Sequence, residues 1–103
     1  MGTWVKAGKS SQFADGDVHG VDLDGTPVAI YCIDGALYAT SDVCTHAFAF
    51  LSDGFLDGCT IECPLHAGRF DVRTGRALGH PVTVNVRTYP VKRDGDDVLV
   101  ELD

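Results

Sequence analysis

The sequence has no apolar run of the roughly 20 residues that a membrane-spanning helix needs, and nothing resembling a signal peptide precedes Trp4. It also lacks an excess of basic residues, since eight lysines and arginines stand against 15 acidic residues, for a net charge of −7. Nucleic acid, whose phosphates require a basic face, is therefore not expected as a partner. These absences predict a soluble, cytoplasmic protein that does not contact a membrane. The acidic balance favours docking on a basic protein surface, although solubility alone explains it equally well.

A helical period of useful length is also absent, so we expect the regular structure to come from strands. Short runs rich in β-branched and aromatic residues are separated by Asp-Gly and other turn dipeptides, the pattern of antiparallel hairpins. The expected strands begin at Trp4 and continue as Val18–Leu23, Val28–Ile33, Ala36–Thr40, Cys59–Glu62, Arg69–Arg73, Arg76–Leu78, Val82–Val86, Tyr89–Arg93 and Val98–Leu102. We expect residues 1–103 to form one all-β domain, a small antiparallel sandwich or barrel with ligand-bearing loops at one end.

Cysteine is sparse, and two of the four cysteines each lie close to a histidine. The two stretches are Cys44-Thr45-His46 and Cys63-Pro64-Leu65-His66. Thiolates and imidazoles are soft or borderline metal ligands, so four of them in so short a segment predict a metal centre. In zinc fingers each local pair is of one type, Cys with Cys and His with His. Here both pairs are mixed, which suits a binuclear centre in which one metal takes the thiolates and the other the imidazoles.

This is the ligand set of a Rieske [2Fe–2S] cluster, in which two histidines replace two cysteines on one iron. The segment from Cys44 to Tyr89 resembles the Rieske-type ferredoxins that serve bacterial aromatic-ring-hydroxylating dioxygenases. The resemblance implies a Rieske-like fold and one [2Fe–2S] cluster per chain. It also implies that Cys44 and Cys63 bind the inner iron, while His46 and His66 bind the outer iron at an exposed edge.

A tetrahedral zinc site uses the same four ligand atoms, so a zinc-stabilised binding module is the alternative from a different class. The residues around the ligands favour the cluster. Pro64, Gly68 and the dipeptide Phe70-Asp71 match the Rieske pattern together with the ligands, whereas either half of the motif alone would be weak.

The remaining histidines and cysteines are interpreted as bystanders. His19 and His80 have no other metal-binding residues clustered around them, so we expect both on the surface. Cys32 lies in an apolar run and is predicted to be a small buried residue, while Cys59 opens a strand. A disulfide between these two cysteines is the alternative.

The chain lacks the features of the catalytic components of such systems. A terminal oxygenase needs a second, mononuclear iron held by two histidines and a carboxylate, and a flavin reductase needs a glycine-rich dinucleotide fingerprint. The resemblance therefore implies an electron carrier with two transient partners, a ferredoxin reductase and a terminal oxygenase. The small subunit of another oxidoreductase, such as a nitrite reductase, is the alternative among redox proteins.

Two aromatic residues, Phe48 and Phe50, distinguish the first loop from the small or polar residues typical of the ferredoxins it resembles. One hypothesis is that one of them forms an apolar rim beside His46 that contacts a partner. The alternative is that both pack over the cluster and exclude water. Four nearby acidic residues are either a docking ring or, more simply, solvated turn residues. They are Asp53, Asp57, Glu62 and Asp71.

The reduction potential is predicted to lie near the bottom of the Rieske range, which runs from about −150 to +300 mV. The high-potential proteins of cytochrome bc complexes have a disulfide between their loops, at positions that are Ala49 and Leu65 here. Those proteins also place a serine and a tyrosine, both donors to the sulfurs, where this chain has Gly68 and Phe70. Fewer donors stabilise the added electron less, so the potential falls. A redox titration measures the midpoint, and a clearly positive value would contradict the prediction.

Overall fold

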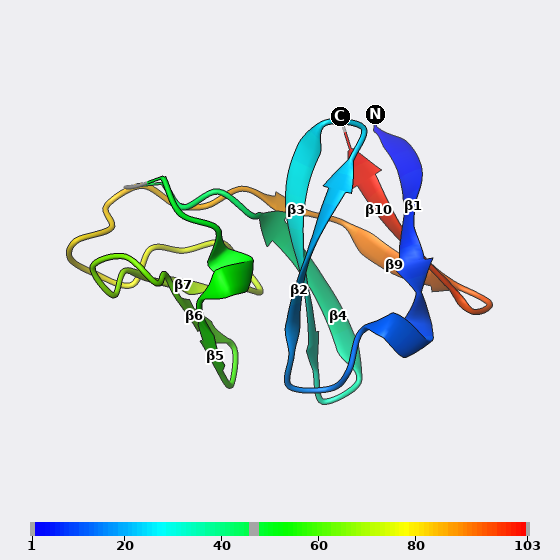
Figure 1. The fold of residues 1–103 in the computed structure, drawn as a ribbon, viewed down its shortest axis with the longest axis horizontal. Helices are drawn as coiled ribbons and strands as arrows, with labels where there is room; N and C mark the ends of the chain where they lie inside the picture. The colour runs from blue at the N-terminus through cyan, green and yellow to red at the C-terminus, as the bar shows by residue number, and fades with distance from the viewer. Residues whose placement is uncertain (1, 46–47, 103) are drawn as a thin grey trace.

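The computed structural model describes residues 2–45 and 48–102, in which ten strands form three antiparallel sheets (Figure 1). The first sheet has the order β1 (Thr3–Lys9), β10 (Asp97–Leu102), β9 (Val91–Asp94). The second has the order β2 (Val18–Leu23), β3 (Thr26–Ile33), β4 (Ala36–Ser41), β8 (Thr88–Tyr89). The third has the order β5 (Phe55–Asp57), β6 (Thr60–Glu62), β7 (Arg69–Asp71). Two 3₁₀ turns, Ser10–Gln12 and Leu51–Asp53, are also formed, and no helix in the described ranges is long and apolar enough to cross a membrane.

Two of the chain's Asp-Gly dipeptides make the tight hairpin turns on either side of β3 that the sequence predicts. Asp24 and Gly25 join β2 to β3 with φ angles of +53° and +88°, and Asp34 and Gly35 join β3 to β4 with +50° and +80°. Positive φ at both central residues defines the turn whose twist matches antiparallel strands, and Asp-Gly tolerates it well. The antiparallel all-β fold expected from the sequence is confirmed.

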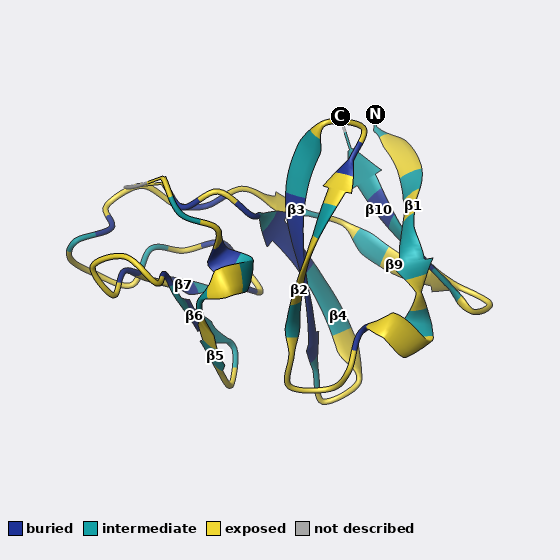
Figure 2. Cartoon of the chain, viewed as in Figure 1, coloured by how far each residue is buried: buried dark blue, intermediate teal, exposed yellow. Residues whose placement is uncertain are grey.

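Strand β3 is the centre of the molecule because both of its faces are buried (Figure 2). On one face, Val28, Ile30 and Cys32 pack in the core that β10 also lines. On the other face, Ala29 and Tyr31 pack in a second core lined by β6 and β7. A strand buried on both sides requires a nearly continuous apolar run, and β3 has the sequence TPVAIYCI. Strand β3 therefore joins the third sheet to the rest of the fold.

The prediction of strands at Arg76–Leu78 and Val82–Val86 is wrong, since both segments lie in the long connection between β7 and β8. The run of β-branched residues reflects burial rather than a ladder, because its first and last valines are buried while Val84 is exposed. Its backbone bonds to a turn instead, with the Val86 N–H donating to the Gly75 carbonyl at 2.8 Å.

Phe70→Ala is expected to lower the free energy of unfolding by about 3–5 kcal/mol, because the fully buried ring on β7 leaves a cavity beneath β3. Phe55 on β5 offers a matched control, since 65% of its surface is exposed. Phe55→Ala is expected to change stability by no more than about 0.5 kcal/mol. Urea unfolding of both variants measures the difference, and equal losses would contradict this assignment of the core.

Candidate metal centre

Three loops gather at one end of the molecule's 39 Å long axis, at the opposite end from the β9–β10 turn (Figure 1). They are residues 43–45 with 48–52, residues 63–68 and residues 77–86, here called the loop cap. The first loop contacts the second where the Cys44 side chain lies beside the Cys63 thiol. It contacts the third where the Thr45 hydroxyl donates to the Val84 carbonyl at 2.8 Å. Both predicted cysteine ligands therefore come together at this end.

The first loop leaves β4 and is closed at its base by a buried carboxylate. Asp42 is 5% exposed and accepts hydrogen bonds from the Ser52 N–H at 2.7 Å and the Ser52 hydroxyl at 2.8 Å. A second hydrogen bond closes the same loop further from its base, from the Cys44 N–H to the Ala49 carbonyl at 2.9 Å. These bonds fix the loop so that the Cys44 side chain faces the core.

The second loop joins β6 to β7 as a hairpin. Its closing bond runs from the Cys63 N–H to the Gly68 carbonyl at 2.6 Å. Between these residues His66 and Ala67 adopt φ angles of +64° and +56°, in the left-handed region that residues other than glycine rarely enter. Such backbone strain is often found at functional sites. It accompanies a loop that buries Cys63 and exposes His66 to solvent.

The two thiols lie side by side with almost no solvent contact, Cys44 at 4% and Cys63 at 1% exposure. Burial raises the pKa of the Cys63 thiol to about 11, although the Leu65 N–H acts in the opposite direction by donating to the sulfur. The buried Cys63 thiol therefore resists ionisation unless a strong positive charge lies beside it. Iron supplies such a charge, so this donor pair fits the inner side of a [2Fe–2S] cluster.

The remaining site predictions have different outcomes. His46 lies outside the described residues. His19 and His80 are exposed, as expected for surface histidines, and the His19 ring meets the Phe13 ring edge-on at 5.7 Å between centroids. Cys32 is buried, and neither Cys32 nor Cys59 takes part in a disulfide, so the alternative is not formed.

Sequence reasoning missed two supporting residues, Asp42 and Thr45. The position of Thr45 between two predicted ligands was the available signal for a structural role. Its partner could not be predicted, because Val84 lies 39 residues further along the chain. The bond from Asp42 to Ser52 spans ten residues and has no local motif. The third loop braces the first through Thr45, so it belongs to the site although it contains no predicted ligand.

The model of the Rieske [2Fe-2S] domain matches residues 3–90, which is most of the chain. The chain belongs to the Rieske [2Fe-2S] domain family. The ferredoxin component of the naphthalene 1,2-dioxygenase system from Pseudomonas aeruginosa is 52% identical to this Rieske protein over 99 residues, which cover 96% of this chain and 95% of that protein.

Two solved ferredoxins share the fold of this Rieske protein. The ferredoxin of carbazole 1,9a-dioxygenase from Nocardioides aromaticivorans IC177 has a TM-score of 0.91 at 40% identity, covering 95% of this chain and 96% of that chain. A ferredoxin in a complex of reduced oxygenase and oxidized ferredoxin in carbazole 1,9a-dioxygenase has a TM-score of 0.90 at 39% identity, covering 95% and 92%. This Rieske protein is therefore an electron carrier of the ferredoxin type that binds one [2Fe–2S] cluster.

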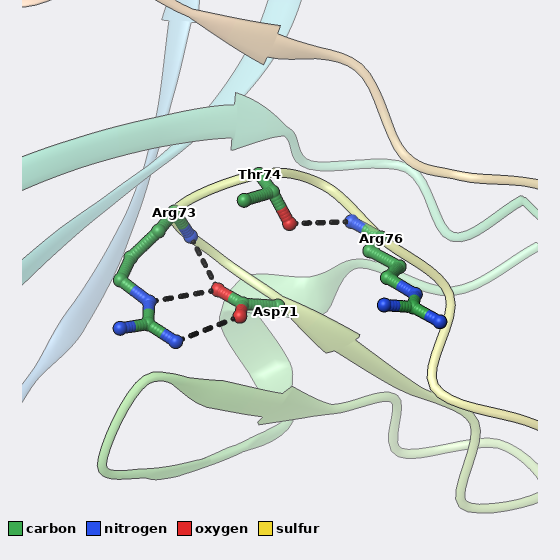
Figure 3. A network of polar contacts seen from close by, with 4 residues as sticks. All are labelled: Asp71, Arg73, Thr74 and Arg76. Carbon is green, nitrogen blue, oxygen red and sulfur yellow. Dashed lines mark hydrogen bonds and ion pairs between the residues drawn. The ribbon is translucent and has the colours of Figure 1, made fainter.

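Two of the four acidic residues considered for a docking ring are engaged within the third sheet and its turn. Glu62 pairs with Arg69 at 3.4 Å. Asp71 accepts from the Arg73 guanidinium at 2.9 and 3.2 Å and from the Arg73 N–H at 2.9 Å (Figure 3). These hydrogen bonds hold the pKa of the Asp71 carboxyl below its ordinary value of 3.8. The Asp71–Arg73 pair thus supports the turn after β7.

Asp71→Asn is expected to destabilise the protein in a way that depends on pH. A carboxyl whose pKa is lower in the folded state contributes stability above its unfolded pKa, and this contribution is lost as the pH falls through the folded value. The stability difference between wild type and Asp71→Asn is therefore largest above about pH 5 and shrinks below about pH 4. Urea unfolding between pH 6 and pH 3 measures it.

Arg73→Gln is the matched variant because it removes the other partner of the same ion pair. In a chain that already has Arg73→Gln, Asp71→Asn is expected to cost less stability than it does in wild type above about pH 5. The double variant should therefore be only slightly less stable than either single variant. A stability difference for Asp71→Asn that stays constant across this range would contradict the role of the pair.

Proposed function

We propose that this ferredoxin carries single electrons from a flavin-dependent NAD(P)H reductase to a terminal Rieske oxygenase in the degradation of aromatic compounds. The observation that carries the proposal is the pair of buried thiols, Cys44 and Cys63, within a loop cap that exposes His66. A centre with one exposed edge lets an electron leave where a partner touches the protein. The relative from Pseudomonas aeruginosa supports this assignment, because it is the ferredoxin component of a dioxygenase system.

The proposed cluster ligands are Cys44 and Cys63 on the inner iron and His46 and His66 on the outer iron. When bound, a [2Fe–2S] cluster takes up and releases one electron at a potential set by its ligands and their hydrogen bonds. The chain itself excludes water from both thiolates and directs the Leu65 N–H at the Cys63 sulfur. It also keeps His66 at the surface, where a partner can reach it.

A zinc-stabilised binding module is the rival from another class, and the pattern of the four ligands in the sequence argues against it. One zinc ion needs all four donors around a single point. The two local pairs, Cys44 with His46 and Cys63 with His66, are each mixed, which suits two metals rather than one. The match of residues 3–90 to the Rieske [2Fe-2S] domain supports the cluster over zinc. A nitrite reductase small subunit is less well supported, because a naphthalene system component is 52% identical.

Residues 1–103 are proposed to form one Rieske domain located in the cytoplasm. Four cysteines free of disulfides support that location, because thiols stay reduced there. The reductase and oxygenase are proposed as transient partners, and neither nucleic acid nor membrane is proposed as one. The net charge of −7 suits brief encounters steered by basic partner surfaces.

The purified chain is expected to restore naphthalene oxidation when mixed with NADH and the reductase and terminal oxygenase of the naphthalene 1,2-dioxygenase system from Pseudomonas aeruginosa. It should contain about two iron and two sulfide per chain and absorb visible light. Cys63→Ser is expected to remove the iron, the colour and the turnover, because it removes a buried thiolate ligand. Product formation, metal analysis and the visible spectrum measure these outcomes.

Cys59→Ser is the matched control, since Cys59 is a free, half-buried cysteine in the turn between β5 and β6. It should retain iron, colour and turnover. A colourless wild-type chain that binds one zinc would overturn the cluster assignment. A coloured chain that reduces no oxygenase would overturn the proposed function.

A further inference from the structure

The loop cap is an apolar region on an otherwise charged molecule. Among the described residues eight large apolar side chains are exposed, and six of them lie on the loop cap, where many residues are coloured as exposed (Figure 2). They are Val43, Phe48, Phe50, Leu65, Leu78 and Val84. Phe48 has an exposed fraction of 101%, so its ring is not buried by any described side chain. Apolar groups gathered in this way are typical of a protein interaction site.

The charge pattern singles out the same surface. None of the 15 acidic and eight basic residues lies within the three segments of the loop cap. The first loop is flanked in the sequence by two acidic residues, Asp42 and Asp53. The second is flanked by Glu62 and Arg69, which form an ion pair of 3.4 Å. The third is flanked by two basic residues, Arg76 and Arg87. Asp42 is buried at the base of the first loop, so Asp53 is the acidic neighbour of that loop that solvent reaches, while Arg76 and Arg87 are exposed beside the third loop.

We propose that the loop cap docks on the terminal oxygenase, with Phe48 as the anchor that enters an apolar recess of that protein. This inference rests on the proposed function. A fully exposed aromatic ring gains the most from burial in a partner, and aromatic anchors of this kind dominate the energy of many interfaces. The recess should be uncharged at its centre, with basic groups facing Asp53 and acidic groups facing Arg76.

The charge distribution favours this occupant over a second copy of the chain. Two copies would bring together bodies that each have a net charge of −7, and a neutral loop cap offers no charge to offset their repulsion. An oxygenase is favoured as the occupant because a ferredoxin 39% identical to this chain is found in a complex with one. The exposed charges of Asp53, Arg76 and Arg87 then help to set the orientation of docking, and the apolar surface of the loop cap supplies the affinity.

Phe48→Ala is expected to lower the second-order rate constant for reoxidation of the dithionite-reduced chain by the oxygenase of the naphthalene 1,2-dioxygenase system by about tenfold. The visible spectrum and the midpoint potential should not change, because the ring does not pack against the protein core. Phe48→Leu should recover much of the rate, since an apolar side chain is restored. Stopped-flow absorbance measures the rates.

Phe55→Ala is the matched control, because Phe55 is also an exposed phenylalanine but lies on β5 outside the loop cap. Its rate should stay within about twofold of wild type. Equal rates for Phe48→Ala and wild type would overturn the docking inference alone, whereas no reoxidation of wild type would overturn the proposed function with it. A loss seen only with the reductase, or a dimer in sedimentation that Phe48→Ala dissolves, would assign the surface to a different occupant and overturn the inference.

Discussion

Two thiols from separate loops lie side by side in the protein interior, and the arrangement of the loop cap depends on keeping them there. Burial opposes the ionisation of Cys63, and Cys44 lies directly beside it. A bound iron would reverse this balance, because metal coordination favours the thiolate form of its cysteine ligands. The protein must therefore hold both loops in place. It does so with the Asp42 carboxylate at the base of one loop and the Gly68 carbonyl at the base of the other.

Strand β3 connects this end to the rest of the molecule. Successive residues of β3 pack alternately in two different cores. The third sheet, β5-β6-β7, packs on one face of β3, and the sheet that contains β1 and β10 packs on the other. The one hydroxyl buried on this strand is satisfied, because the Tyr31 hydroxyl pairs with the Thr40 hydroxyl at 2.8 Å. Burial also raises the pKa of Tyr31, so the side chain stays neutral. The third sheet thus rests on a buried strand that has no charged side chain.

Features set by neighbouring residues could be predicted from the sequence, and those set by distant partners could not. The Asp-Gly hairpins and the pairing of cysteines with histidines are local patterns, and the strands around the hairpins formed as expected. The run Val82–Val86 is not a strand because its backbone bonds to Gly75 and to the Thr45 side chain rather than to a neighbouring strand. Asp42 was missed for the same reason, since its partner Ser52 lies across a loop.

Charge and apolar surface have separate roles in this molecule, and the separation suits a carrier that must bind and leave quickly. Charges on the body act over about a Debye length and speed the encounter, but they add little affinity once screened. A small apolar contact centred on Phe48 supplies affinity only after the loop cap has reached its partner. Such a contact is small enough to release readily, as weak electron-transfer interfaces do. The same exposed rings would favour self-association in a neutral protein, so the net charge of −7 is what allows them to remain exposed.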